Sequence, residues 1–345
     1  MPDEYRFSFG PWNISDGADP FGPPVRPVVD FADKLRLYKQ LGFAGVQLHD
    51  DDAVPALADK SPAEVVAEAE RLKKVLDGEG LVVEILAPRL WEDPRGIDGG
   101  FTANDPASRK WALERSKQCI DIANALGTKL IILWLAREGT YIREAKNAIS
   151  AYRVLVDALN ELLEYDPQIE LAIEPKPNEP MDQAYVPTMG HAVALAAQTV
   201  DPARVGGVME TAHARLAGLD PADEMAFALS VGKLWSVHLN DQNGLKYDQD
   251  KAFGSVDLRG AFNQVRILEE GGYARSGRFV GLDVKAMRTQ KADQAHQHLA
   301  NSKAVFLQLV EKVRTFPKDV EDECLAARDY EALEMAVLAH LLGGK

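Results

Sequence analysis

Short apolar runs alternate with longer amphipathic stretches along almost the whole chain. Eight runs have the length and the β-branched or aromatic content of buried strands, and they span residues 6–12, 44–50, 81–87, 129–135, 170–176, 205–211, 234–240 and 278–285. Stretches of helical periodicity separate them, and one of these begins with a Ser61-x-x-Glu64 start and ends before Gly80. The alternation predicts parallel strands with crossover helices, and eight strands are the number that closes a (β/α)8 TIM barrel.

A doubly wound open sheet is the alternative arrangement of the same elements. Such sheets usually carry a Gly-rich phosphate-binding loop, and none follows any of the eight runs. We therefore predict a barrel domain over residues 1–310 and a short C-terminal helical tail over residues 311–345. The tail ends EALEMAVLAHLLGGK, which is apolar enough that it needs a surface to lie on.

The charge balance is clearly acidic, with a formal net charge of −14. Nucleic acid and anionic membrane surfaces both require clustered Lys and Arg, so we expect no nucleic acid and no membrane among the partners. No apolar stretch reaches membrane-spanning length and the start MPDEYRFSFG does not resemble a signal peptide, so we expect a cytoplasmic protein. The two cysteines, Cys119 and Cys324, are too few for a disulfide framework or a Cys-based zinc site.

Polar and aromatic residues stand where the predicted strands end, and barrel active sites are built at the carboxyl ends of the strands. In chain order these positions hold Trp12, His49, Pro88 with Trp91, Trp134, Glu174 with Lys176, Glu210 with His213, His238, and Asp283 with Lys285. Several carboxylates at one mouth would repel one another by kilocalories unless cations held them. The pattern favours a metal site that includes the segment EPKPNEP (174–180), although a buried ion pair between Glu174 and Lys176 is the alternative.

Further candidate residues have ordinary explanations when each is taken alone. Asp248 and Asp250 flank a single residue in the segment DQNGLKYDQD, where both can reach one hard cation, but a solvated loop is the more ordinary explanation of that spacing. The tryptophans Trp12, Trp91 and Trp134 fit either core packing or stacking on the apolar face of a sugar.

The segments IEPKPNEP, LNDQNGLKYDQDKAFGSVDL, HDDD, DGGFTANDP and DPFG together resemble the xylose isomerases of the shorter class. The similarity runs from about residue 5 to about residue 310. It implies a TIM barrel with two divalent metal ions, manganese, cobalt or magnesium, and a small-molecule sugar as substrate. The implied activity is the interconversion of an unphosphorylated aldose and ketose by a hydride shift.

The resemblance also implies roles for individual residues. Glu174, Glu210 and Asp283 would serve one metal, and Glu210 would bridge to a second held with His213, Asp248 and Asp250. Lys176 would hydrogen-bond the oxygen that gains charge, with Lys285 as a further cation beside Asp283, and His49, oriented by Asp52, would assist ring opening. Trp12 and Trp134 would wall the pocket, and Phe21 in DPFG would reach into a neighbouring subunit, which implies a homodimer or homotetramer.

Three departures from the family pattern bear on the substrate. His238 stands where the family has a fourth carboxylate, and imidazole suits transition metals better than magnesium. Beside the third strand, APRLW replaces a threonine-containing segment, so that Pro88 removes a hydroxyl donor, and LWLAREG replaces a glycine-bearing turn after the fourth. A site that has lost hydrogen-bond donors binds the hydroxyl groups of the family's usual sugars less well. The sequence therefore does not identify the sugar.

Two other functions stay open. The residues Glu174, Glu210, His238 and Asp283 resemble the single-metal site of ketose epimerases in the same barrel superfamily, with Glu174 and Asp283 as the two bases, and a lyase acting on an oxidised sugar is a related possibility. A non-catalytic sugar-binding protein with a decayed metal site is the alternative from another class.

Overall fold

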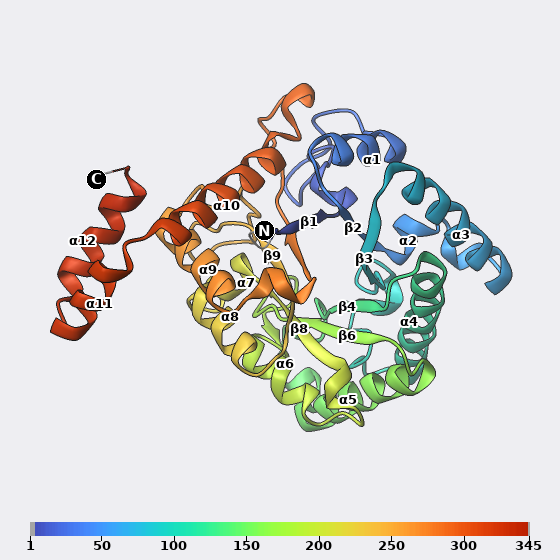
Figure 1. Cartoon of the computed structure of the whole chain (residues 1–345). Coiled ribbons are helices and arrows are strands. Elements are labelled where there is room, and N and C mark those ends of the chain that lie inside the picture. Colours follow the sequence, from blue (N-terminus) through green and yellow to red (C-terminus); the bar gives the residue numbers. More distant parts are fainter. Residues whose placement is uncertain (1–3, 344–345) are drawn as a thin grey trace.

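The computed structural model describes residues 4–343. Eight parallel strands close into a barrel in the order β1-β10-β9-β8-β6-β4-β3-β2, and helices surround it (Figure 1). The strands are β1 (Arg6–Phe9), β2 (Gly45–His49), β3 (Val82–Ala87), β4 (Leu130–Trp134), β6 (Glu170–Glu174), β8 (Val205–Glu210), β9 (Leu234–Leu239) and β10 (Phe279–Leu282). Each of the eight predicted runs contains one of these strands, so the barrel prediction is confirmed.

The strands are shorter than the sequence pattern predicted. β1 ends at Phe9, and residues Pro11–Asn13 form a 3-10 turn instead of continuing the strand. β6 ends at Glu174, because Pro175 has no N–H to donate to the ladder, and the N–H of Lys176 bonds the carbonyl of Val186 instead. Trp12 and Lys176 therefore lie outside the strands, whereas His49, Trp134, Glu174 and Glu210 are the last residues of theirs.

The main helices are α1 (Phe31–Gln40), α3 (Pro62–Glu79), α4 (Pro106–Leu126), α5 (Ala148–Tyr165), α6 (Met189–Ala196), α8 (Pro221–Ser230), α9 (Leu258–Glu270) and α10 (Gln297–Thr315). The predicted start of α3 is confirmed: the side chain of Glu64 accepts from the N–H of Ser61 at 2.8 Å, and the hydroxyl of Ser61 accepts from the N–H of Glu64 at 3.4 Å. Gly80 ends this helix with φ of +65°, which glycine adopts without a steric penalty. Two short helices, α2 (Asp50–Ala53) and α7 (Thr211–Leu216), begin directly after β2 and β8.

Alternation along the strands separates two cores. The barrel interior is filled by Ile85, Ala87, Leu130, Ile132, Ala172, Val208 and Trp235. Residues of the opposite parity, such as Ile131 and Leu171, pack outward in the larger core with the helices. Ile132, Ala172 and Val208 point into the barrel, and side chains two positions further along a strand point the same way. Trp134, Glu174 and Glu210 therefore face inward at the carboxyl mouth. The alternation of side chains along the strands thus brings the polar residues at the strand ends together at the barrel mouth.

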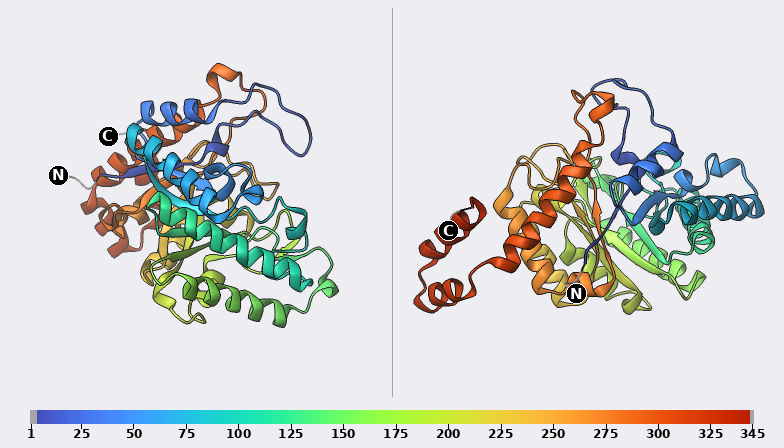
Figure 2. Two further views of the ribbon diagram at one scale, coloured as in Figure 1. Left: turned by 90° about the vertical axis from the view of Figure 1, so that its right-hand side faces the viewer. Right: turned by 45° about the horizontal axis from the view of Figure 1, so that its top comes forward.

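Two C-terminal helices, α11 (Lys318–Ala327) and α12 (Tyr330–Leu341), project from the side of the barrel beyond α9 and α10 (Figures 1 and 2). Ion pairs between Glu321 and Arg266 and between Glu334 and Arg259 join them to α9. Several of their large apolar side chains are exposed, namely Leu325, Tyr330, Met335 and Leu342. The division of the chain into a barrel domain and a separate tail stays a prediction.

Within residues 4–343, no helix combines the length and the apolar character needed to cross a lipid bilayer.

Candidate active site

Four predicted ligands meet at the ends of four neighbouring strands. Glu174 ends β6, Glu210 ends β8, His238 lies in β9, and Asp283 follows β10, and one ligand atom from each lies within 4.8 Å of the others. The Nδ1 atom of His238 is 3.4 Å from Oε1 of Glu174 and 3.9 Å from Oε2 of Glu210. We refer to these four residues as the first cluster.

A second cluster consists of Glu210, His213 and Asp248. His213 lies on α7, one turn after Glu210, so its Nε2 atom is 3.3 Å from Oε1 of Glu210. The same nitrogen is 3.2 Å from Oδ2 of Asp248, which comes from the loop after β9. Glu210 therefore belongs to both clusters, in the bridging position that the resemblance implied.

Because these ionisable groups are buried and close together, they shift one another's pKa values. Burial, followed by the charges of Asp248 and Asp283, raises the pKa of Glu210 well above its usual value. Burial alone would lower the pKa of His238, but Glu174 outweighs it and raises that pKa to about 9. Like charges held this close are stable only when positive charge balances them.

Several ligand atoms in the two clusters are buried and have no hydrogen-bond partner. They are Nδ1 of His213, Oδ1 of Asp248 and both ring nitrogens of His238. Buried polar atoms are otherwise almost always hydrogen-bonded. Mixed carboxylate and imidazole donors that converge in this way suit a divalent cation, so the residues fit the two metals that the family implies.

Asp250 and Lys285 form an ion pair next to the second cluster. Asp250 lies beside the second cluster, where its carboxylate pairs with Lys285 and accepts from Nδ2 of Asn240 at 3.1 Å. Lys285 therefore contacts Asp250, and the charge of Asp250, together with that of Asp283, raises the pKa of Lys285. Asn240 also donates to Oε1 of Glu210 at 2.9 Å, and the sequence analysis had not assigned it a role.

The segment EPKPNEP does not form an ion pair between Glu174 and Lys176. The ammonium of Lys176 lies 2.9 Å from Oδ2 of Asp248 and 3.3 Å from Oε2 of Glu179, and 5.2 Å from the ring centroid of Trp134. Burial would lower the pKa of Lys176, but Asp248 outweighs it, and the pKa is raised above its ordinary value. Glu179 also accepts from the N–H of Asp248 at 3.0 Å, so both charges at the end of the segment face the loop after β9.

An aromatic wall lines the side of the mouth formed by β1 to β4. Its ring centroids follow one another at 4.6 Å from Trp12 to His49, 5.2 Å from His49 to Trp91, and 4.6 Å from Trp91 to Trp134. The indole N–H of Trp12 donates to Oδ1 of Asp283 at 3.0 Å, which connects the wall to the first cluster. The three tryptophans thus line the mouth together with His49.

His49 and Asp52 form the predicted pair, with 2.9 Å between Nδ1 and Oδ2. Arg89, which the sequence analysis passed over, lies against both: its Nη2 is 2.8 Å from Nδ1 of His49 and 3.2 Å from Oδ1 of Asp52. The acidic run HDDD could have pointed to an arginine here, because three adjacent aspartates after a buried strand need cations close by.

Phe21 follows β1 in the chain and is 83% exposed, and its ring makes an edge contact to Tyr247 at 6.3 Å between ring centroids. Its predicted entry into a neighbouring subunit stays a prediction.

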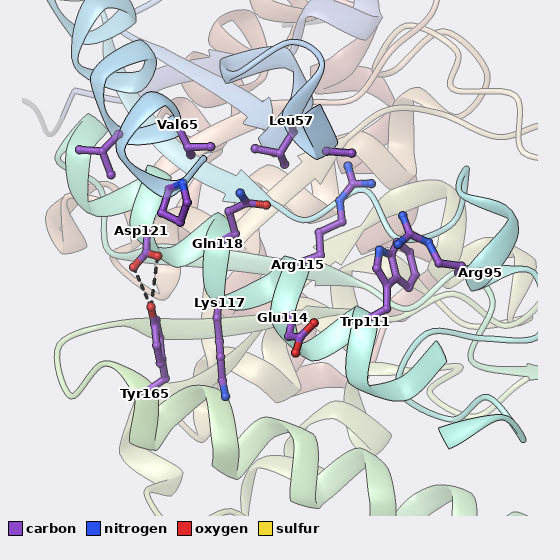
Figure 3. A pocket seen from close by; sticks show the side chains of 13 residues that line it. Leu57, Val65, Arg95, Trp111, Glu114, Arg115, Lys117, Gln118, Asp121 and Tyr165 are labelled. Carbon is purple, nitrogen blue, oxygen red and sulfur yellow. Dashed lines mark hydrogen bonds between the residues drawn. The ribbon is translucent and has the colours of Figure 1, made fainter. Parts of the chain in front are cut away.

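A separate hollow of about 450 Å³ lies on the outside of the barrel and is lined largely by α3 and α4 (Figure 3). Val65, Trp111 and Arg115 line it, together with Tyr165, whose hydroxyl donates to Asp121 at 3.0 Å. None of the predicted site residues lines this hollow. Arg115 nevertheless reaches inward, with its Nε 2.7 Å from Oδ2 of Asp50.

The sequence and the fold of this chain are similar to those of known proteins. The family model described as xylose isomerase-like TIM barrel matches residues 35–302. The xylose isomerase of Thermus thermophilus is 36% identical over 332 residues, which cover 95% of this chain and 84% of that protein. Among solved structures, the 3-keto-D-glucoside 4-epimerase of E. coli has a TM-score of 0.63 at 15% identity, covering 88% of this chain and 100% of that one. A D-psicose 3-epimerase has a TM-score of 0.63 at 13% identity, covering 88% and 99%, and such low identities show the fold alone. The chain, as its sequence motifs indicated, belongs to the xylose isomerase family.

Proposed function

We propose that this protein is a divalent-metal-dependent isomerase that interconverts an unphosphorylated aldose and ketose by a hydride shift. The observation that carries the proposal is the sharing of Glu210 between two buried ligand clusters, with the ammonium of Lys176 against the second. A single-metal enzyme has no need for the second cluster.

The first cluster would hold one divalent cation and the second cluster the other, with Asp250 available next to the second. Bound cations supply Lewis acidity toward substrate oxygens and lower the pKa of bound water. His238 replaces an anionic ligand by a neutral one, which favours manganese or cobalt over magnesium.

Lys176 would stabilise the substrate oxygen that gains charge during the hydride shift. An ammonium has three N–H donors, and Asp248 and Glu179 accept from two directions, which leaves one donor for the substrate. The two carboxylates also fix the position of the ammonium before the substrate arrives, which is the condition for efficient electrostatic stabilisation.

The aromatic wall would pack against the apolar face of the sugar and keep bulk water away from the reacting carbons. The cations at the mouth, Lys176, Lys285 and Arg89, are each paired with carboxylates. This pairing leaves these three cations less available to a phosphate group, which supports an unphosphorylated sugar as the substrate.

The proposal is tested by assaying metal-stripped protein on a panel of aldopentoses, aldohexoses and ketoses after addition of manganese, cobalt or magnesium. We expect activity only with metal, and more with manganese or cobalt than with magnesium. A substrate deuterated at the reacting carbon should keep its label in the product. Absence of isomerisation with every metal and sugar would refute the proposal, and equal rescue by magnesium would argue against His238 as a ligand.

A ketose epimerase is the second candidate, and the first cluster favours it. Three carboxylates and a histidine on neighbouring strands suffice for one metal, and Glu174 and Asp283 would be the bases on opposite faces of one carbon. Proton abstraction exchanges the substrate hydrogen with solvent, so incorporation of deuterium from D₂O would indicate the epimerase. The pairing of Lys176 with Asp248 supports the isomerase, because it places a fixed cation where a hydride shift needs one.

A further inference from the structure

The Nδ1 atom of His49 faces an acceptor and a donor at the same time. Oδ2 of Asp52 lies 2.9 Å from it, and Nη2 of Arg89 lies 2.8 Å from it. A neutral imidazole carries one N–H, so Nδ1 either donates to Asp52 or accepts from Arg89, and it does not do both. The choice fixes the other ring nitrogen, Nε2, as an acceptor in the first case and as a donor in the second.

Asp52 has hydrogen-bond donors other than the ring of His49. Its Oδ2 atom accepts from the backbone N–H of His49 at 3.0 Å, and its Oδ1 atom accepts from Nη2 of Arg89 at 3.2 Å. The guanidinium of Arg89 stays protonated in proteins, so its Nη2 always presents two hydrogens. One of them is directed to Oδ1 of Asp52, and the other can be donated to Nδ1 of His49 when that nitrogen carries no proton.

Arg89 is held in this position from several sides. Its Nε donates to Oδ1 of Asp51 at 2.8 Å, its Nη1 donates to Oε1 of Glu92 at 3.2 Å, and its side chain is only 17% exposed. The backbone N–H of Arg89 donates to Oδ1 of Asp50 at 3.1 Å, and Asp50 is anchored by Arg115. The guanidinium therefore cannot leave Nδ1 without breaking several charge-assisted hydrogen bonds.

We propose that Arg89 is a positioning residue that holds His49 in the tautomer with its proton on Nε2. The imidazole, which lies between Trp12 and Trp91 in the aromatic wall, then enters the pocket as a hydrogen-bond donor. This inference rests on the proposed function and deepens it: the donor would polarise the oxygen at the anomeric carbon of a bound sugar. In this tautomer Nε2 has no lone pair with which to take a proton from the sugar.

The test is ¹⁵N NMR of the full-length protein labelled at histidine, at neutral pH with magnesium as a diamagnetic cation. The chain has 7 histidines, so His49 is assigned by the signal that His49→Gln removes. We expect Nδ1 at the chemical shift of an unprotonated ring nitrogen and Nε2 at that of a protonated one. In Arg89→Met, Nδ1 is free to donate to Asp52 and the two assignments should exchange.

Arg95→Met is the matched control, because this arginine pairs with Asp93 in the same loop and makes no hydrogen bond to His49. Its spectrum should match the wild type. If Arg89→Met does not fold, Arg89→Gln, whose amide is too short to reach Nδ1, should give the same exchange. A proton on Nδ1 in the wild type, or an unchanged tautomer in a folded Arg89 variant, would overturn the proposal.

The NMR spectrum tests the tautomer of His49, and the sugar assay tests the proposed function, so either one can be refuted without the other. A wild-type protein with the proton on Nε2 but without isomerase activity would refute the proposed function and keep the tautomer assignment. An active wild-type protein with the proton on Nδ1 would refute the tautomer assignment alone.

Discussion

The two sides of the barrel mouth are built on opposite physical principles. On the side of β1 to β4, aromatic rings contact one another and the ions around Arg89 are paired with carboxylates. On the side of β6 to β10, buried carboxylates and histidines crowd together, and several of their atoms have no hydrogen-bond partner. The first side is complete as it stands and shapes a pocket, whereas the second requires added cations.

Two histidines illustrate the same contrast. Glu174 raises the pKa of His238 to about 9 against the effect of burial, because the acidic side stabilises positive charge. Burial lowers the pKa of His298 to about 4, where its Nε2 contacts the carbonyl oxygen of Asn13 at 2.9 Å beneath the aromatic side. The difference indicates that metal binding and substrate shape are separable properties of this site.

The largest effect is expected for Glu210→Gln, because this residue belongs to both clusters. Activity should fall below detection, and calorimetry should show weakened binding at both metal sites. The metal-free variant should melt close to metal-free wild type, because the raised pKa of Glu210 already favours its uncharged form there. Glu170→Gln, at the start of β6, is the control and should leave metal binding unchanged. Full metal affinity in Glu210→Gln would show that the clusters do not share a ligand.

Lys176→Met should lower kcat by roughly 10²–10³, the range seen when one oxyanion donor is removed. Metal stoichiometry should be unchanged, because the proposed partner of Lys176 is the substrate and not the cation. Steady-state kinetics and metal titration measure the two properties, with Lys246→Met on the exposed loop as the control. Normal turnover in Lys176→Met would remove the hydride-shift assignment.

Stability should fall with acid through His298. Its pKa is about 4 in the folded protein against 6.5 ordinarily, so the unfolded chain binds the proton more readily. The stabilisation is complete above pH 6.5 and is lost as the pH falls toward 4, by roughly 3 kcal/mol at most. Urea titrations at several pH values should show a shallower acid dependence in His298→Gln. An identical dependence in both proteins would contradict this assignment.

Trp134→Phe should reduce kcat/KM by roughly 2- to 10-fold, which corresponds to an aromatic contact of about 0.5–1.5 kcal/mol. Metal affinity should stay the same, since among residues 4–343 the indole of Trp134, unlike that of Trp12, makes no hydrogen bond to a ligand residue. Trp235→Phe, in the barrel interior, is the control for a general loss of packing. A change in metal affinity equal to the change in kcat/KM would break the proposed separation.

Phe21→Ala should have the smallest effect, a rise in KM without a change in kcat, if the exposed ring completes the site of a neighbouring subunit. We expect a dimer or tetramer by sedimentation, with Val28→Ala, another exposed residue in this segment, as the control. A fully active monomer that is indifferent to Phe21→Ala would sink the shared-site prediction and leave the metal chemistry intact.

Much of the fold and of the ligand set is local information. Short apolar runs of β-branched and aromatic residues placed all eight strands, and polar residues at their ends converge because barrel mouths collect strand ends. Strand ends were less accurate, since Pro11 and Pro175 interrupt ladders that composition alone would continue.

The sequence by itself determined the eight strands, the helix starts and the residue types at the mouth, because these depend on neighbours a few positions apart. Only the tertiary structure decided which charges pair. Lys176 meets Asp248, 72 positions away, Arg89 meets His49 across 40 positions, and Trp12 meets Asp283 across 271. Barrel closure brings these residues together, and the strength of an electrostatic contact follows distance in space, which local sequence patterns do not encode.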